Sequence, residues 1–124
     1  LKRLPGKFFT GVALWSYLEH EANPQAVLEQ VRRVLRDDGV MLVKTPNYAC
    51  WNRVLLGKNW SGFRHPDHVQ YFTPATLGAM ARRAGFKVHF RLYGRIPAND
   101  NLYATLWPET SARSGQTVQH DANV

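Results

Sequence analysis

Hydrophobic residues occur along the chain in blocks whose spacing changes from one block to the next. Residues 8–18 are mostly apolar, and the run 12–15 (Val-Ala-Leu-Trp) is typical of a buried strand. Residues 40–43 (Val-Met-Leu-Val) form a second apolar run. Because this run does not alternate with polar residues, it predicts a strand covered on both faces, as in a parallel sheet.

The segment between these two strands has the pattern of an amphipathic helix. Asn23 can accept a hydrogen bond from the first helical turn, and Pro24 suits the first helical position because its missing N–H has no partner there. Gly39 is predicted to end the helix as a left-handed residue. The apolar side carries Val27, Val31, Val34 and Leu35, and the solvated side carries Glu29, Arg32, Arg33 and Arg36.

The second half of the chain predicts further elements. A short helix is expected over 50–56, and a helix that starts after Thr73-Pro74 should end at Gly85. Residues 86–93 alternate apolar and polar side chains, which indicates a half-exposed strand, and 102–107 is expected to pair with it as a hairpin. The polar residues 108–124 are expected to be a disordered tail.

The fold class follows from strand, helix and strand in succession, a βαβ unit, which predicts an α/β protein. A chain of 124 residues that is 44% hydrophobic and 20% charged suits one globular domain, expected over residues 1–107. No apolar stretch approaches the roughly 20 residues of a membrane-spanning helix, so no membrane partner is predicted.

Charge and cysteine content narrow the possible chemistry. Sixteen basic and nine acidic side chains give a net charge of +7, which suits an anionic partner without identifying one. Cys50 is the single cysteine, so a disulfide within the chain and a Cys-rich zinc site are excluded. A reducing, cytoplasmic location is expected.

Several motifs, taken in order, resemble the class I S-adenosylmethionine-dependent methyltransferases, and more narrowly their ubiquinone-biosynthesis-like branch. The similarity covers roughly residues 8–92. The resemblance implies a partial Rossmann-like sheet from the fourth strand onward, with flanking helices and a C-terminal β-hairpin. It also implies S-adenosylmethionine as cofactor and a small-molecule acceptor. The matching segments are Val12 to His20, Asn23-Pro24, Val31 to Val40, Thr45-Pro46-Asn47, Trp60 to Phe63, His68 to Leu77 and Ala84-Gly85-Phe86.

Two features of that family are missing from the sequence. It contains neither the glycine-rich loop that approaches the cofactor nor the strand that ends in a ribose-binding acid. The chain therefore resembles the C-terminal portion of such a domain. We expect it to have no methyltransferase activity by itself.

The resemblance places Leu14, Trp15 and Ser16 beside the methionine part of the cofactor. Ligands of open α/β sheets bind beyond the carboxyl ends of the strands, and these residues lie at such an end. The alternative is that Trp15 simply packs in the core.

Glu19 and His20 follow directly and form a candidate acid–base pair. They could also contribute metal ligands, or only orient the turn by hydrogen bonds. Similar enzymes that hold a divalent metal in this turn use a further glutamate, whose position is occupied here by Ser16. No metal site is therefore predicted.

The polar cluster at 64–68 (Arg-His-Pro-Asp-His) is the other candidate. His68 matches the family motif, and a neutral imidazole is a suitable base for an alcohol or phenol acceptor. Trp60, Arg64 and His65 are expected to contact the acceptor. The alternative is a purely structural loop.

Two functions of other classes remain open. The basic side chains would suit a module that binds RNA or DNA, although the helix pattern already explains the arginines as a solvated face. A truncated α/β scaffold could also be an interaction domain that associates with itself through an open sheet edge.

Overall fold

The first strand, helix and strand form the predicted βαβ unit. In the computed structural model, which describes residues 2–91 and 98–110, β1 (Phe9–Trp15) is followed by the short 3₁₀ helix η1 (Leu18–His20), α1 (Pro24–Val34) and β2 (Leu35–Pro46). Strands β1 and β2 pair in parallel. The Asn23 side chain accepts a hydrogen bond from the Ala26 N–H at 3.1 Å, so the predicted helix start is confirmed.

The predicted end of this helix at Gly39 is wrong. Leu35 is already extended and pairs with Phe9 of β1. The N–H groups of Lys7 and Phe8 donate to the carbonyls of Arg33 and Val34, which therefore find partners outside the helix. Positive φ angles occur at Gly57 and Gly85 among the described glycines, so Gly39 is not a left-handed residue.

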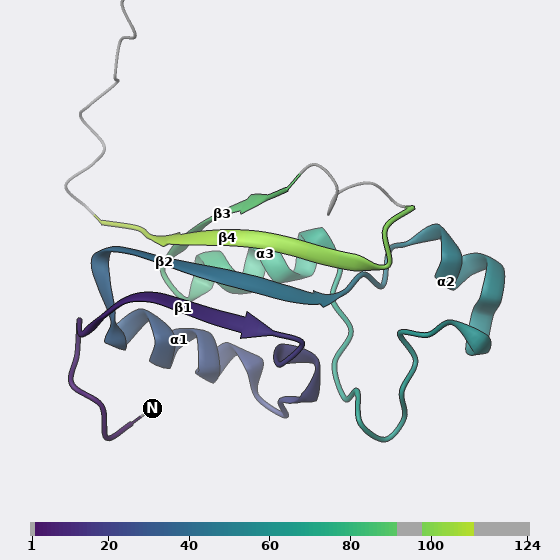
Figure 1. The fold of residues 1–124 in the computed structure, drawn as a ribbon, viewed down its shortest axis with the longest axis horizontal. Coiled ribbons are helices and arrows are strands. Elements are labelled where there is room, and N and C mark those ends of the chain that lie inside the picture. Colours follow the sequence, from purple (N-terminus) through teal and green to yellow (C-terminus); the bar gives the residue numbers. More distant parts are fainter. Residues whose placement is uncertain (1, 92–97, 111–124) are drawn as a thin grey trace, which may run out of the picture.

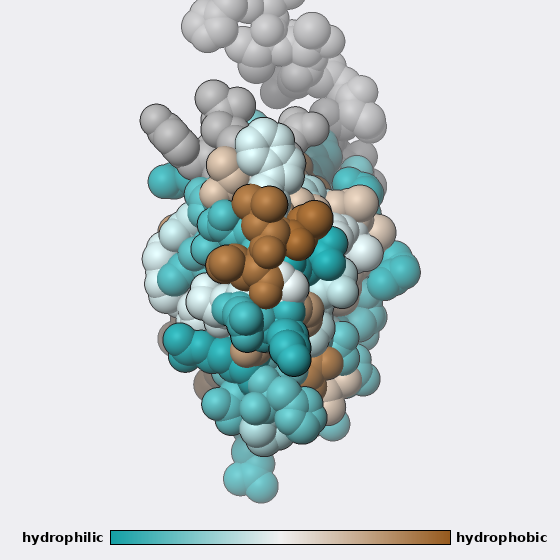
Figure 2. Space-filling view, turned by 90° about the vertical axis from the view of Figure 1, so that its right-hand side faces the viewer, coloured by the Kyte–Doolittle hydropathy of each residue, from teal (hydrophilic) through white to brown (hydrophobic). Residues whose placement is uncertain are grey.

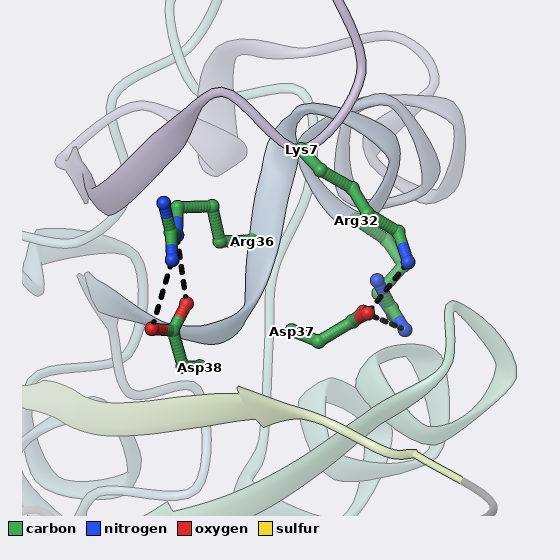
Figure 3. Close-up of polar contacts among 5 residues, drawn as sticks. All are labelled: Lys7, Arg32, Arg36, Asp37 and Asp38. Carbon is green, nitrogen blue, oxygen red and sulfur yellow. Dashed lines mark hydrogen bonds and ion pairs between the residues drawn. The ribbon is translucent and has the colours of Figure 1, made fainter.

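The early helix end places the residues after Val34 in β2 instead. Arg36 pairs with Asp38 (Nε to Oδ1, 2.9 Å), and Asp37 contacts both Lys7 and Arg32 (Figure 3). These ion pairs lie at the turn between α1 and the sheet-forming part of β2, and Arg36 does not belong to the solvated helix face.

The remaining elements complete a four-stranded sheet. They are α2 (Trp51–Leu56), the 3₁₀ helix η2 (Gly57–Asn59), α3 (Pro74–Arg83), β3 (Phe86–Phe90) and β4 (Asn101–Pro108). The strand order is β1-β2-β4-β3, and β4 is antiparallel to both of its neighbours. The α/β class and the antiparallel β3–β4 pair are thus confirmed, while the predicted strand residues Leu92 and Tyr93 lie outside the described residues.

In the part of the chain that the structure describes, helices cover one face of the sheet. Helices α1 and α3 contact each other, and their buried side chains form one core with the facing residues of the strands. The prediction that 40–43 is covered on both faces is wrong for the described part of the chain, because Leu42 is 39% exposed while Met41 and Val43 are buried. The main core residues are Leu14, Leu28, Val31, Met41, Val43, Leu77, Ala81, Phe86, Leu102 and Leu106.

Helix α3 has the predicted ends. Thr73 and Thr76 form a reciprocal capping box, Pro74 occupies the first turn, and Gly85 follows with φ +85°. Strand β4 reaches Pro108, which pairs with Phe86. The prediction that the disordered tail begins at residue 108 is therefore wrong at Pro108, because this residue is held in the sheet, and residues 111–124 of the expected tail lie outside the described residues.

Helix α2 lies beyond the carboxyl ends of β1 and β2 (Figure 1). It presents Val54, Leu55 and Leu56 to solvent, and apolar side chains gather on this end of the molecule (Figure 2). Within residues 2–91 and 98–110, no helix has the length and apolar character needed to cross a membrane.

Candidate active site at the carboxyl ends of the parallel strands

The chain turns sharply where β1 ends. Ser16 has φ +50°, a left-handed conformation that costs energy for a residue with a side chain, and its N–H donates to the Lys44 carbonyl on β2 at 3.0 Å. Trp15 is 58% exposed and lies against Tyr103, with ring centroids 5.8 Å apart. The alternative placement of Trp15 in the core is therefore wrong, whereas Leu14 is a core residue.

Glu19 is buried at the centre of the site. It is 1% exposed, and its Oε2 accepts a hydrogen bond from the Thr45 hydroxyl at 3.1 Å. Its backbone carbonyl accepts from the N–H groups of Val69 and Gln70, at 2.9 and 3.1 Å. Glu19 thus ties the loop that precedes α3 to the carboxyl ends of both parallel strands.

His20 and His68 meet across this junction. Their ring centroids are 4.8 Å apart, with the rings nearly perpendicular. The Nδ1 atom of His20 lies 2.7 Å from the Asp67 carbonyl oxygen, and that of His68 lies 2.8 Å from the Gly62 carbonyl oxygen. Since a carbonyl can only accept, each Nδ1 carries a proton, and Nε2 is the nitrogen of each ring that is left to accept a proton or bind a ligand.

A pocket of about 310 Å³ opens at this point. Its wall carries both acidic and basic groups from strands, turn and loop, so the site offers proton acceptors and cations together. The lining includes Ser16, Glu19, His20, Lys44, Arg64 and His68.

Two of the predicted acceptor residues lie elsewhere. Trp60 is 1% exposed and packs against Phe63, with ring centroids 5.4 Å apart. His65 lines a separate cleft of about 680 Å³ together with Arg53, Lys58 and Tyr71. The structure therefore brings Ser16, Glu19, His20, Arg64 and His68 to one pocket. The other predicted site residues, Leu14, Trp15, Trp60 and His65, do not line it, and Trp15 lines a separate pocket with Tyr103.

Thr45 and Lys44 also belong to the site, although no sequence motif gave them a role there. Thr45 is fully buried and holds Glu19, and Lys44 lines the pocket beside Trp15, with its Nζ 5.4 Å from that ring centroid. The sequence did contain one signal for them. Both residues lie at the carboxyl end of a predicted strand, and ligands bind at that edge of α/β sheets. Which of them faces the site depends on the register of β2.

Two pKa shifts occur near the pocket. The hydrogen bond with Glu21 raises the pKa of the Tyr17 hydroxyl, so Tyr17 stays protonated and is not a base at neutral pH. Burial raises the pKa of the Cys50 thiol, which therefore remains a thiol rather than a nucleophilic thiolate.

The fold and the site together define an α/β domain with a ligand pocket at the carboxyl ends of its parallel strands. The sequence identifies the family more closely. Residues 3–89 match the model of a methyltransferase domain, so the chain belongs to that family. No curated protein sequence matches it significantly.

Solved methyltransferase structures share the fold at low sequence identity. A possible histamine N-methyltransferase from Thermotoga maritima superposes with a TM-score of 0.66 and 15% identity, covering 85% of this chain and 58% of its own length. An S-adenosylmethionine-dependent methyltransferase from Archaeoglobus fulgidus gives 0.66 and 16%, with 85% and 62% covered. The N1-methyltransferase of 1,6-didemethyltoxoflavin from Burkholderia thailandensis, solved with S-adenosylhomocysteine, gives 0.62 and 18%, with 85% and 46% covered. The chain thus spans less than two-thirds of each.

Proposed function

We propose that this chain carries the portion of an S-adenosylmethionine-dependent methyltransferase from the fourth strand onward, and that the intact enzyme methylates an oxygen, nitrogen or carbon atom of a small-molecule acceptor. Membership of the methyltransferase domain family supports the reaction type. The observation that carries the proposal is the left-handed Ser16 at the end of β1, beside a pocket that also contains Glu19, His20 and His68.

The residues at the end of β1 fit the methionine part of the cofactor. The turn at Ser16 carries the chain away from the sheet beside the pocket, which leaves space for a ligand beyond the strand end. In this proposal the backbone of Leu14, Trp15 and Ser16 borders the cofactor, which supplies an electrophilic sulfonium methyl group. The protein then has mainly to align the acceptor with that group.

His68 is the proposed general base. Its Nδ1–H is held by the Gly62 carbonyl, so the Nε2 lone pair can take the proton that an acceptor hydroxyl or amine loses as it is methylated. His20 and the buried Glu19 complete the acid–base group. The Nδ1–H of His20 is likewise held by a backbone carbonyl, that of Asp67. Arg64 lines the same pocket and is proposed to contact the acceptor. Trp60 is buried and supports the loop, and His65 would contact only an acceptor long enough to reach the separate cleft that it lines.

The test is a titration of the folded chain with S-adenosylhomocysteine. Calorimetry measures the affinity, and amide NMR shifts show which residues the ligand contacts. Without the glycine-rich loop, we expect binding weaker than micromolar, with shifts confined to Leu14–Ser16 and the pocket residues. Shifts that are absent at millimolar ligand, or that fall elsewhere, would refute the proposed site. We also expect no turnover by the 124 residues alone, and detectable methyl transfer would show that part of the proposal to be wrong.

A further inference from the structure

Three metal-binding side chains from two distant segments converge in the pocket. Glu19 and His20 belong to η1, and His68 belongs to the loop before α3. One ligand atom from each of the three side chains lies within 4.8 Å of the other two. Ligand atoms around one cation lie closer together than this, so the three side chains would close on the ion as it binds.

Both histidines are held in the form that binds metals. Each ring donates its Nδ1–H to a backbone carbonyl, of Asp67 for His20 and of Gly62 for His68. Metal-ligating histidines characteristically donate their second ring nitrogen to a carbonyl or carboxylate, which fixes the ring and directs the other lone pair at the ion. The two Nε2 atoms are therefore oriented before any ion binds.

Glu19 provides the oxygen ligand. Its carboxyl group is buried, and within residues 2–91 and 98–110 it forms no ion pair and accepts its side-chain hydrogen bond from Thr45. A buried carboxylate is costly unless a positive charge compensates it. A cation between Glu19 and the two imidazoles would supply that charge.

We propose that Glu19, His20 and His68 bind a divalent transition metal of the zinc type. Two imidazoles and one carboxylate suit zinc and its neighbours, whereas magnesium and calcium prefer oxygen ligands alone. The remaining coordination positions face the pocket. This inference deepens the proposed function and rests on it for the role of the metal, which would bind an acceptor oxygen and lower its pKa. With the metal bound, Nε2 of His68 is a ligand and not a base, so the metal takes the place of His68 as the group that activates the acceptor. Metal binding itself is measurable without cofactor or acceptor.

The experiment uses the chain without a His tag and Co²⁺ alone as the probe. We expect visible d–d absorption bands that saturate at one equivalent, displacement of Co²⁺ by Zn²⁺, and a Zn²⁺-dependent rise in Tm that a chelator reverses. Absence of both the bands and the Tm rise would overturn the proposal. Because no S-adenosylhomocysteine is present, this outcome is independent of the cofactor titration.

Variants locate the ion. His20→Gln and His68→Gln should each weaken Co²⁺ binding more than tenfold, and Thr45→Val, which frees Glu19, should weaken it by about tenfold. His89→Gln, an exposed histidine on β3, is the matched control and should bind as the original chain does. His20 is exposed, so its variant should keep the fold even where His68→Gln does not. Unchanged affinity in His20→Gln, or an equal loss in His89→Gln, would place the ion elsewhere and overturn the proposal.

Discussion

Gly62 shows how strongly a single residue is constrained near the pocket. A Cβ atom built at this position would lie 2.1 Å from Cη2 of the Trp60 ring, which is buried. Either the ring or the Gly62 backbone, whose carbonyl holds His68, would therefore have to move. Only a residue without a side chain allows Trp60 and His68 to be positioned together.

Gly62→Ala should lower the free energy of unfolding by about 1–3 kcal/mol, the usual cost of overpacking. Gly11→Ala on β1 is the matched control, because the nearest atom to its added Cβ is 3.9 Å away. We expect it to change stability by less than about 0.5 kcal/mol. Urea unfolding measures both variants, and equal stabilities would contradict the close packing of Trp60 on Gly62.

At the scale of elements, the turn between α1 and the paired part of β2 depends on ionised carboxylates. The hydrogen bond from Lys7 lowers the pKa of Asp37, assisted by the charges of Lys7 and Arg32, and the hydrogen bond from Arg36 lowers that of Asp38. A lowered pKa in the folded state means that the stabilisation is complete above the usual value of 3.8 and is lost as the pH falls through the folded-state value.

The free energy of unfolding should therefore decrease below about pH 4, and Asp37→Asn should make that decrease shallower. Both carboxylates are exposed, so the effect should be small and should weaken further at high salt. Denaturant titrations at a series of pH values test this expectation. An identical pH profile in Asp37→Asn would show that the ion pairs do not stabilise the turn.

The helices differ in how they contribute to stability. Leu28 of α1 is fully buried, whereas Leu55 of α2 is 80% exposed. Leu28→Ala should cost about 2–5 kcal/mol, while Leu55→Ala should stay within about 0.5 kcal/mol. The two variants remove the same atoms, so a comparable loss in thermal or urea unfolding would mean that α2 is covered in solution.

On the scale of the whole molecule, the open face and the free edge of β1 determine how chains can associate. β1 pairs with β2 on one side and with no other strand in the described part of the chain. Trp15 and Trp107 are also exposed, at 58% and 43%. Unpaired strand edges next to apolar surface favour pairing with another chain.

We therefore expect sedimentation equilibrium to give a mass that rises above 14.2 kDa as the protein concentration increases. Ala13→Lys on β1 should suppress this rise. Thr105→Lys on β4 is its control. Ala13 and Thr105 both lie opposite Leu42, so the two lysines would stand in one row across the sheet, but only Ala13 is on the strand with the unpaired edge. Suppression by Thr105→Lys alone would indicate face-to-face association, and a constant mass would exclude self-association under these conditions.

Much of the fold was predictable because local signals define it. Asn23-Pro24 and Thr73-Pro74 mark helix starts by capping, and Gly85 marks a helix end through its positive φ. Gly39 failed as such a marker because the carbonyls at the end of α1 are satisfied by Lys7 and Phe8, which lie far from them in sequence. Exposure of Leu42 also could not be predicted, since it depends on where α1 and α3 pack.

The candidate site, like the fold, was predictable where local sequence signals define it and not where distant segments meet. The sequence by itself determined the α/β class, the methyltransferase resemblance and the candidacy of Glu19, His20 and His68, because residue type and local spacing carry that information. Only the tertiary structure decided that His68 joins Glu19 and His20, that Thr45 holds the carboxylate, and that Trp60 and His65 lie outside the pocket. The physical reason is that these contacts join segments far apart in the chain, and the sheet register and loop path that bring them together are fixed by packing of the whole domain.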